Sequence, residues 1–158
     1  MDITYTNYLK IDELTNLQQL KSDPPEHDEM LFIIIHQTYE LWFKQILHEI
    51  GKLNLELQAG NTWNSLKTMR RILTVMKTLV SQVDILETMT PLEFNNFRAF
   101  LGQSSGFQSL QFRELEILCG LRLPLMKEAH KNNAVHLERL EQRMKLPTLW
   151  ESFCAYIT

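Results

Sequence analysis

The sequence contains little glycine, proline or cysteine, and each shortage limits what the chain can be. Its five glycines and five prolines fall between periodic apolar segments, so no repeat, low-complexity tract or flexible linker is indicated. The two cysteines, Cys119 and Cys154, are far apart and match no metal-ligand or redox spacing. We expect both to be reduced thiols of a cytoplasmic protein, because disulfides are rare in that compartment.

Dense basic clusters and long apolar runs are also missing. Lysine and arginine are scattered through a chain of net charge -3, so binding of nucleic acid is not expected. The longest unbroken apolar run, Met30–Ile35, is far shorter than the roughly 20 residues of a membrane span. The first residues lack the basic and apolar regions of a secretory signal. We therefore expect no membrane partner.

Apolar residues that recur at intervals of three and four predict a single all-α domain over residues 1–158. We expect a short helix or turn at 8–14, and helices at 26–58, 63–87, 91–101, 107–119, 124–145 and from 148 onward. Thr90 with Glu93, and Thr148 with Glu151, have the spacing of capping boxes. The core-facing stripe of the 63–87 helix is predicted to be Leu66, Met69, Leu73, Met76, Leu79, Val80 and Val83.

One imidazole in an otherwise apolar helix is the most informative local feature. Phe32 and His36 are four residues apart, so their rings share a helix face and suit an aromatic ligand that carries an N–H. Further on, Arg98 precedes a loop of small residues at 104–106 and can hold a carboxylate through two hydrogen bonds. Phe32 and Phe97 can sandwich a ring. Together these residues favour a site for a small aromatic zwitterion, although each one alone is compatible with core or surface packing.

Other chemistries have weaker support. No glutamate is followed by histidine three residues later, as a carboxylate-bridged di-iron bundle requires. His130 and His136 are six residues apart, which does not bring them together on one helix, and we expect both to be solvated. Residues 104–106 lack the nucleophile elbow of a serine hydrolase. A metal site formed by this chain alone is therefore not expected.

Four segments resemble the tryptophan 2,3-dioxygenase family: Tyr5–Leu9, His27–Glu49, Phe97–Leu101 and Ser104–Arg113. They follow one another in the family's order. The resemblance implies a helical bundle of the haem-dependent tryptophan/indoleamine 2,3-dioxygenase type, in a cytoplasmic homotetramer. It also implies haem b as cofactor, with L-tryptophan and O2 as substrates. The product would be N-formylkynurenine, formed in the first step of tryptophan catabolism by the kynurenine pathway.

The same resemblance implies roles for particular residues. His36 would be the catalytic residue that accepts the indole N–H, Arg98 would bind the substrate carboxylate, and Ser105 and Gly106 would lie against the haem. Residues at the N-terminus would complete the pocket of a neighbouring subunit. The implied substrate-binding residues are Tyr5, Tyr8, Leu9, Phe32, Ile33, Ile34, Ile35, His36, Phe94, Phe97, Arg98, Ser104 and Ser105.

The chain departs from the family pattern in two ways. Phe94 stands where the family usually has a tyrosine, and loss of one hydrogen bond to a charged group costs about 1.5–3 kcal/mol. No histidine here matches the family's axial haem ligand, which lies in a C-terminal half that this sequence lacks. We expect the truncated N-terminal portion of a dioxygenase, inactive alone. A haem-free helical binding protein, and a haem-dependent aromatic oxygenase with an altered substrate, remain as alternatives.

Overall fold

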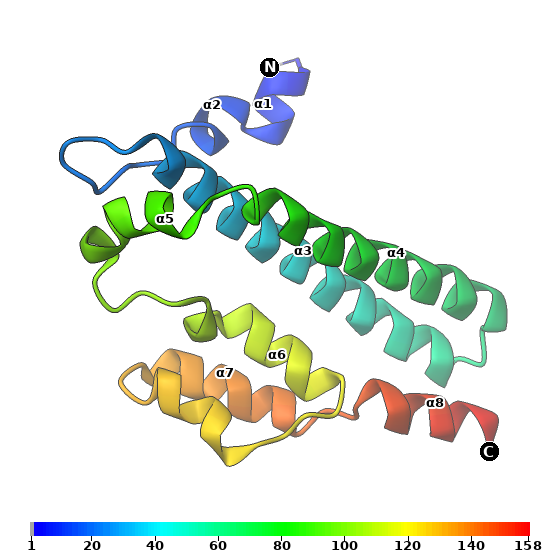
Figure 1. Ribbon diagram of the computed structural model, residues 1–158. Helices are drawn as coiled ribbons and strands as arrows, with labels where there is room; N and C mark the ends of the chain where they lie inside the picture. Colours follow the sequence, from blue (N-terminus) through cyan, green and yellow to red (C-terminus); the bar gives the residue numbers. More distant parts are fainter. Residues whose placement is uncertain (1) are drawn as a thin grey trace.

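A computed structural model describes residues 2–158, and over that range the chain is helical with no strand (Figure 1). The predicted all-α class is confirmed. No helix within the described residues is both long and apolar enough to cross a membrane. In chain order the elements are α1 (Tyr5–Leu9), α2 (Ile11–Leu14), α3 (His27–Gln58), α4 (Thr62–Leu86), α5 (Pro91–Arg98), η1 (Ala99–Leu101), η2 (Gly106–Gln108), α6 (Leu110–Leu118), η3 (Pro124–His130), α7 (Ala134–Met144) and α8 (Leu149–Ile157).

An antiparallel hairpin of α3 and α4 forms the long axis of the molecule (Figure 1). At 1.5 Å per residue, the 32 residues of α3 extend about 48 Å. Gly60 ends α3 with a positive φ of 67°, and the amides of Gly60 and Asn61 donate to the carbonyls of Leu57 and Glu56. The Asn61 side chain then accepts from the amide of Asn64 and caps α4. This short turn directs α4 back along α3.

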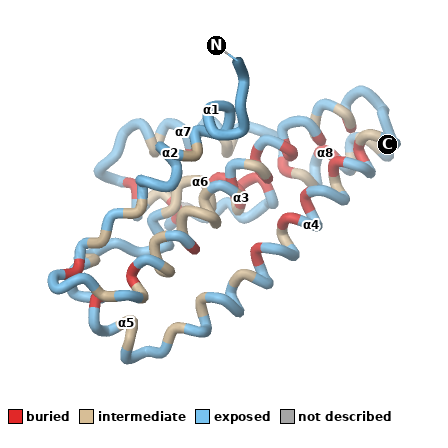
Figure 2. Tube along the Cα trace, turned by 90° about the horizontal axis from the view of Figure 1, so that it is seen from above, coloured by how far each residue is buried: buried red, intermediate tan, exposed pale blue. Residues whose placement is uncertain are grey.

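The main core lies along the second half of α3, where α4, α6 and α8 pack against it (Figure 2). A second, smaller core joins α6, η3 and α7 through Ile117, Met126 and Leu140. The side chains buried in the main core are Phe43, Ile46, Leu47, Ile50, Leu53, Leu57, Ile72, Val75, Leu79, Leu115 and Leu118.

The buried face of α4 differs from the predicted stripe. Of the predicted residues, Leu79 is buried and Met69 and Met76 are partly buried, whereas Leu66, Leu73, Val80 and Val83 are exposed. The stripe prediction was wrong because α4 carries two parallel rows of residues, and the more apolar row faces solvent. Two of the residues that face α3 are small and polar. The full set is Ser65, Thr68, Ile72, Val75 and Leu79.

Helix boundaries were predicted well where capping residues mark them. The capping boxes at Thr90 and Thr148 are both formed, with the threonine hydroxyl and the glutamate carboxylate exchanging bonds with backbone amides. The predicted helix at 107–119 is shorter, because Ser109 caps α6 after η2. At the N-terminus, Lys10 adopts a left-handed conformation with φ 54° and separates α1 from α2.

The predicted continuous helix at 124–145 is interrupted. Asn133 accepts a hydrogen bond from the amide of His136 and starts α7 anew after η3. This break brings His130 and His136 together, with their Nδ1 atoms 3.2 Å apart and His130 buried. The expectation that these histidines are separate and solvated was therefore wrong for His130, because it assumed an unbroken helix.

Candidate ligand cavity

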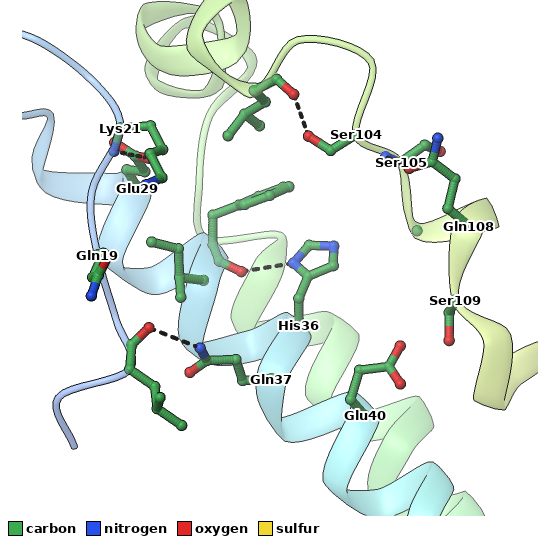
Figure 3. Close-up of a pocket in the computed structure, with 15 residues that line it drawn as sticks. Gln19, Lys21, Glu29, His36, Gln37, Glu40, Ser104, Ser105, Gln108 and Ser109 are labelled. Carbon is green, nitrogen blue, oxygen red and sulfur yellow. Dashed lines mark hydrogen bonds between the residues drawn. The ribbon is translucent and has the colours of Figure 1, made fainter. Parts of the chain in front are cut away.

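A mainly apolar cavity of about 490 Å³ contains several of the residues expected to bind substrate (Figure 3). Its floor is the first half of α3, one wall is the segment before α3, and the other wall is the loop between η1 and α6. The lining residues are Leu17, Gln19, Lys21, Glu29, Phe32, Ile33, His36, Gln37, Glu40, Leu101, Ser104, Ser105, Gly106, Gln108 and Ser109.

The floor is one face of a single helix. Glu29, Ile33, His36 and Glu40 follow at intervals of three and four, so their side chains project to the same side of α3. The rings of Phe32 and His36 are in contact, with centroids 4.1 Å apart. An apolar ring and a hydrogen-bonding ring therefore lie side by side in the cavity, as the spacing of these two residues predicts.

The backbone of α3 fixes the tautomer of His36. Its Nδ1 lies 2.7 Å from the carbonyl oxygen of Phe32, one turn earlier (Figure 3). Because a carbonyl can only accept, Nδ1 carries the proton, and Nε2 of the neutral ring is left as an acceptor. The cavity thus contains a hydrogen-bond acceptor suited to an N–H donor.

The wall that precedes α3 is an extended segment, Leu17–Ser22, which we call the strap. The fully buried carboxylate of Glu29 accepts from the amides of Lys21 (2.7 Å) and Ser22 (2.9 Å) and from the Ser22 hydroxyl (2.5 Å). At the other end, Gln18 donates to the Gln37 side chain (2.6 Å). Gln37 in turn donates to the carbonyl of Leu17 at 3.4 Å (Figure 3). Residues of α3 therefore hold both ends of the strap.

The protonation state of Glu29 follows from these bonds. Burial by itself raises the pKa of this carboxyl group, but the hydrogen bonds from Ser22 and Lys21 and the charge of Lys21 outweigh burial. The net result is a pKa below the ordinary value, so the carboxylate is ionised near neutral pH.

The opposite wall contains the predicted loop residues Ser104, Ser105 and Gly106. The Ser105 hydroxyl accepts from the amide of Phe107, and the Gln108 side chain accepts from the amide of Ser105, which together cap η2. These local bonds give the loop a defined shape beside the cavity.

Arg98 and Glu40 hold the loop and α6 to the rest of the site. Arg98 donates through Nη1 to the carbonyl of Gly102 at 2.9 Å, at the base of the loop. At the far end, Gln111 of α6 donates to both the carboxylate (2.8 Å) and the carbonyl (2.9 Å) of Glu40. Arg98 is exposed and braces the cavity without lining it.

Phe94 and Phe97 pack behind Phe32. The centroid of Phe32 is 5.7 Å from that of Phe94 and 5.6 Å from that of Phe97, which is fully buried. A ligand ring between Phe32 and Phe97 would need centroids about 7 Å apart, or two contact distances of about 3.5 Å. The sandwich expected from the sequence is therefore not formed, and Phe97 supports Phe32 from behind.

The remaining predicted residues lie outside the cavity. Consecutive helical residues point in different directions, so Ile33 lines the cavity while Ile34 is exposed and Ile35 is buried on another face. Tyr5, Tyr8 and Leu9 are exposed on α1, and their contribution to the pocket of another subunit remains a prediction.

Several lining residues were missed by the sequence analysis. On α3, the spacing from His36 could have identified Glu29 and Glu40, but no sequence signal places the strap residues Gln19 and Lys21 at the cavity. Among residues 2–158, no group of three or more histidine, cysteine or acidic side chains is arranged to hold a metal ion.

Comparison with known proteins identifies the family. Residues 1–151 match the model of the tryptophan 2,3-dioxygenase family. A tryptophan 2,3-dioxygenase from Herpetosiphon aurantiacus is 56% identical over 98% of this chain and 59% of its own length. Those from a Nocardioides species (45%) and Xanthomonas campestris (43%) also align over 98% of this chain, and over 60% and 52% of their own lengths. The chain therefore spans somewhat more than half the length of these relatives, and it belongs to the tryptophan 2,3-dioxygenase family.

Proposed function

We propose that this chain supplies the substrate side of a haem-dependent dioxygenase. The enzyme would open the indole 2,3-bond of L-tryptophan with O2 and release N-formylkynurenine. The proposal is supported by family membership and by relatives that bear the name tryptophan 2,3-dioxygenase.

The observation that carries this proposal is the acceptor nitrogen of His36 beside the ring of Phe32. Indole is a flat apolar ring with one N–H donor, and the cavity offers a ring to pack against and Nε2 to accept that hydrogen. The bond between Nδ1 and the Phe32 carbonyl holds the imidazole in the required tautomer. His36 would thus orient the substrate at its N–H, while the strap and the loop exclude water.

The lining fits one side of a haem group. Most of the surface that the lining exposes to the cavity is apolar, and Ser105 and Gly106 present backbone on which a planar group could lie. Among the lining residues, all of which the structure describes, His36 carries the one imidazole, and its proposed partner is the substrate. Bound haem would supply the iron that binds and activates O2. The iron ligand would come from outside this chain.

Recognition of the substrate carboxylate is proposed for Arg98. Its guanidinium would exchange the carbonyl of Gly102 for the carboxylate, which offers two charge-assisted bonds instead of one neutral acceptor. Phe94 adds no hydroxyl to this interaction. A preference for another aromatic substrate is thus the main alternative outcome for the whole enzyme.

Association of several copies is part of the same proposal. Neither α1 nor α2 has a buried residue, and Tyr5 and Tyr8 are 76% and 73% exposed. We infer that this arm packs on another copy in a cytoplasmic homo-oligomer, where Tyr5, Tyr8 and Leu9 complete the other copy's pocket.

The proposal is tested by restoring the segment that the relatives have in addition. The chain is expressed together with the part of the Herpetosiphon protein outside the matched segment, and haem uptake is followed by the Soret band. We expect N-formylkynurenine from the combination, none from the 158-residue chain alone, and less product from the His36→Ala combination at subsaturating tryptophan. A combination that takes up haem but leaves tryptophan unchanged would contradict the proposal and favour another substrate.

A further inference from the structure

We propose that Glu29 is a positioning residue that holds the strap, Leu17–Ser22, closed over the cavity and so controls access to His36. Only the identity of the ligand depends on the proposed function. The closure itself is a property of this chain and can be measured without haem or substrate.

The first support is the bonding of the Glu29 carboxylate. It is fully buried, and a buried charge must be compensated by hydrogen bonds or by an opposite charge. All three of its donors come from the strap, as the amides of Lys21 and Ser22 and the hydroxyl of Ser22. Bonds to an ionised acceptor are roughly twice as strong as neutral ones, so this contact is the strongest attachment of the strap to α3.

The second support is how little apolar surface the strap buries, since Leu20 is only partly buried. Within the strap, all of which the structure describes, Ser22 is the one buried residue, and Leu17 is 61% exposed. Segments that bury little apolar surface open at low free energy. The position of the strap therefore depends on polar bonds to α3, mainly those of Glu29.

The third support is where the bonds lie along α3. Glu29 holds one end of the strap and Gln37 holds the other, while Phe32, Ile33 and His36 lie between them on the cavity floor. Figure 3 shows Gln19, between the two attachments, on the same side of the floor as Glu29. Release of the strap at Glu29 removes the wall that faces the loop and opens the cavity above His36.

The experiment measures the reactivity of His36 in the purified chain. Diethyl pyrocarbonate modifies the free imidazole nitrogen, and His48, exposed on the same helix, is an internal reference. We expect Glu29→Gln, which keeps the side-chain size but removes the charge, to accelerate modification of His36 at least threefold. Modification of His48 should be unchanged. Hydrogen exchange at residues 17–20, whose amides do not bond to Glu29, should accelerate as well.

Two further variants distinguish positioning from general destabilisation. Glu151→Gln is the matched control, because Glu151 also accepts a backbone amide bond, from Thr148 at α8 far along the chain. Glu151→Gln should leave the modification rate of His36 and the hydrogen exchange of the strap unchanged. Ser22→Ala removes one of the three donors and should give a smaller effect in the same direction as Glu29→Gln.

Either of two results would overturn the proposal: an unchanged rate at His36 in Glu29→Gln, or an equal acceleration at His36, His48 and the amides of the main core. A separate measurement addresses the ligand. Protection of His36 by L-tryptophan in the unaltered chain would support the proposed function. Its absence would count against that substrate while leaving the closure by Glu29 intact.

Discussion

At the scale of single residues, His36 has one ring nitrogen bonded to its own helix and one free for a ligand. In the assembled enzyme, we expect His36→Ala to weaken tryptophan binding by the net value of one hydrogen bond, about 0.5–1.5 kcal/mol, or roughly two- to thirteenfold in KM. His48→Ala on the exposed side of α3 serves as the control and should leave KM unchanged. An unchanged KM in His36→Ala would show that His36 does not take part in substrate binding.

Glu29 makes closure of the strap dependent on pH. Burial raises the pKa of Glu29 but the bonds from Ser22 and Lys21 lower it further, so the folded value lies below the ordinary 4.5. The stabilisation is thus fully present above pH 4.5 and is lost as the pH falls from there through the folded pKa. Hydrogen exchange at residues 17–22, corrected for the intrinsic rate at each pH, should report faster opening in this window. In Glu29→Gln this pH dependence should disappear.

The residue roles could be predicted only where they depend on local spacing. Phe32 and His36 are one turn apart, so their contact follows from helix geometry. The predicted sandwich of a ligand ring between Phe32 and Phe97 is not formed. It depends on the spacing between α3 and α5, which no local sequence pattern determines. The bonds of the strap to Glu29 join an irregular segment to a helix, and irregular segments have no periodicity from which a contact can be inferred.

At the scale of helices, α4 provides a direct comparison between adjacent residues. Ile72 is 1% exposed in the core and Leu73 is 59% exposed. We expect Ile72→Ala to lower the free energy of unfolding by about 2–5 kcal/mol, and Leu73→Ala to change it by less than about 0.5 kcal/mol. Urea denaturation of the chain measures both. Equal losses would mean that Leu73 is buried as deeply as Ile72, which would contradict the assignment of the buried face.

Helix ends were predictable from capping residues, but the buried face and the break in the 124–145 region were not. Thr90 and Thr148 mark their helices with local bonds that a sequence displays directly. The buried row of α4 includes the small polar residues Ser65 and Thr68, and no local pattern indicates that α3 covers them rather than the more apolar row. Asn133 is a capping residue as well, but the periodic pattern on either side of it concealed the new helix start.

At the scale of the whole molecule, apolar residues form an exposed row along α4, with Trp63 77%, Leu66 63% and Val80 72% exposed, together with Leu73. Exposed apolar surface of this extent favours association. We expect the purified chain to self-associate in sedimentation velocity. Leu73→Glu should shift it toward monomer, whereas Thr74→Glu, with the same charge change beside the row, should not. A monodisperse monomer at all concentrations would contradict this expectation.

The position of the cavity on α3 also has a consequence for how the molecule unfolds. Within α3, all of which the structure describes, the buried residues before Phe43 are Glu29 and Ile35, whereas the main core begins at Phe43. Local unfolding of α3 should therefore begin at the end that carries the cavity, and the free energy of local unfolding should rise toward the core end of the helix. A ligand bound only by the closed form adds RT ln(1 + [L]/Kd) of stability. That stabilisation would act on the least stable part of α3, so a bound ligand should protect the cavity end of the helix more than the core end.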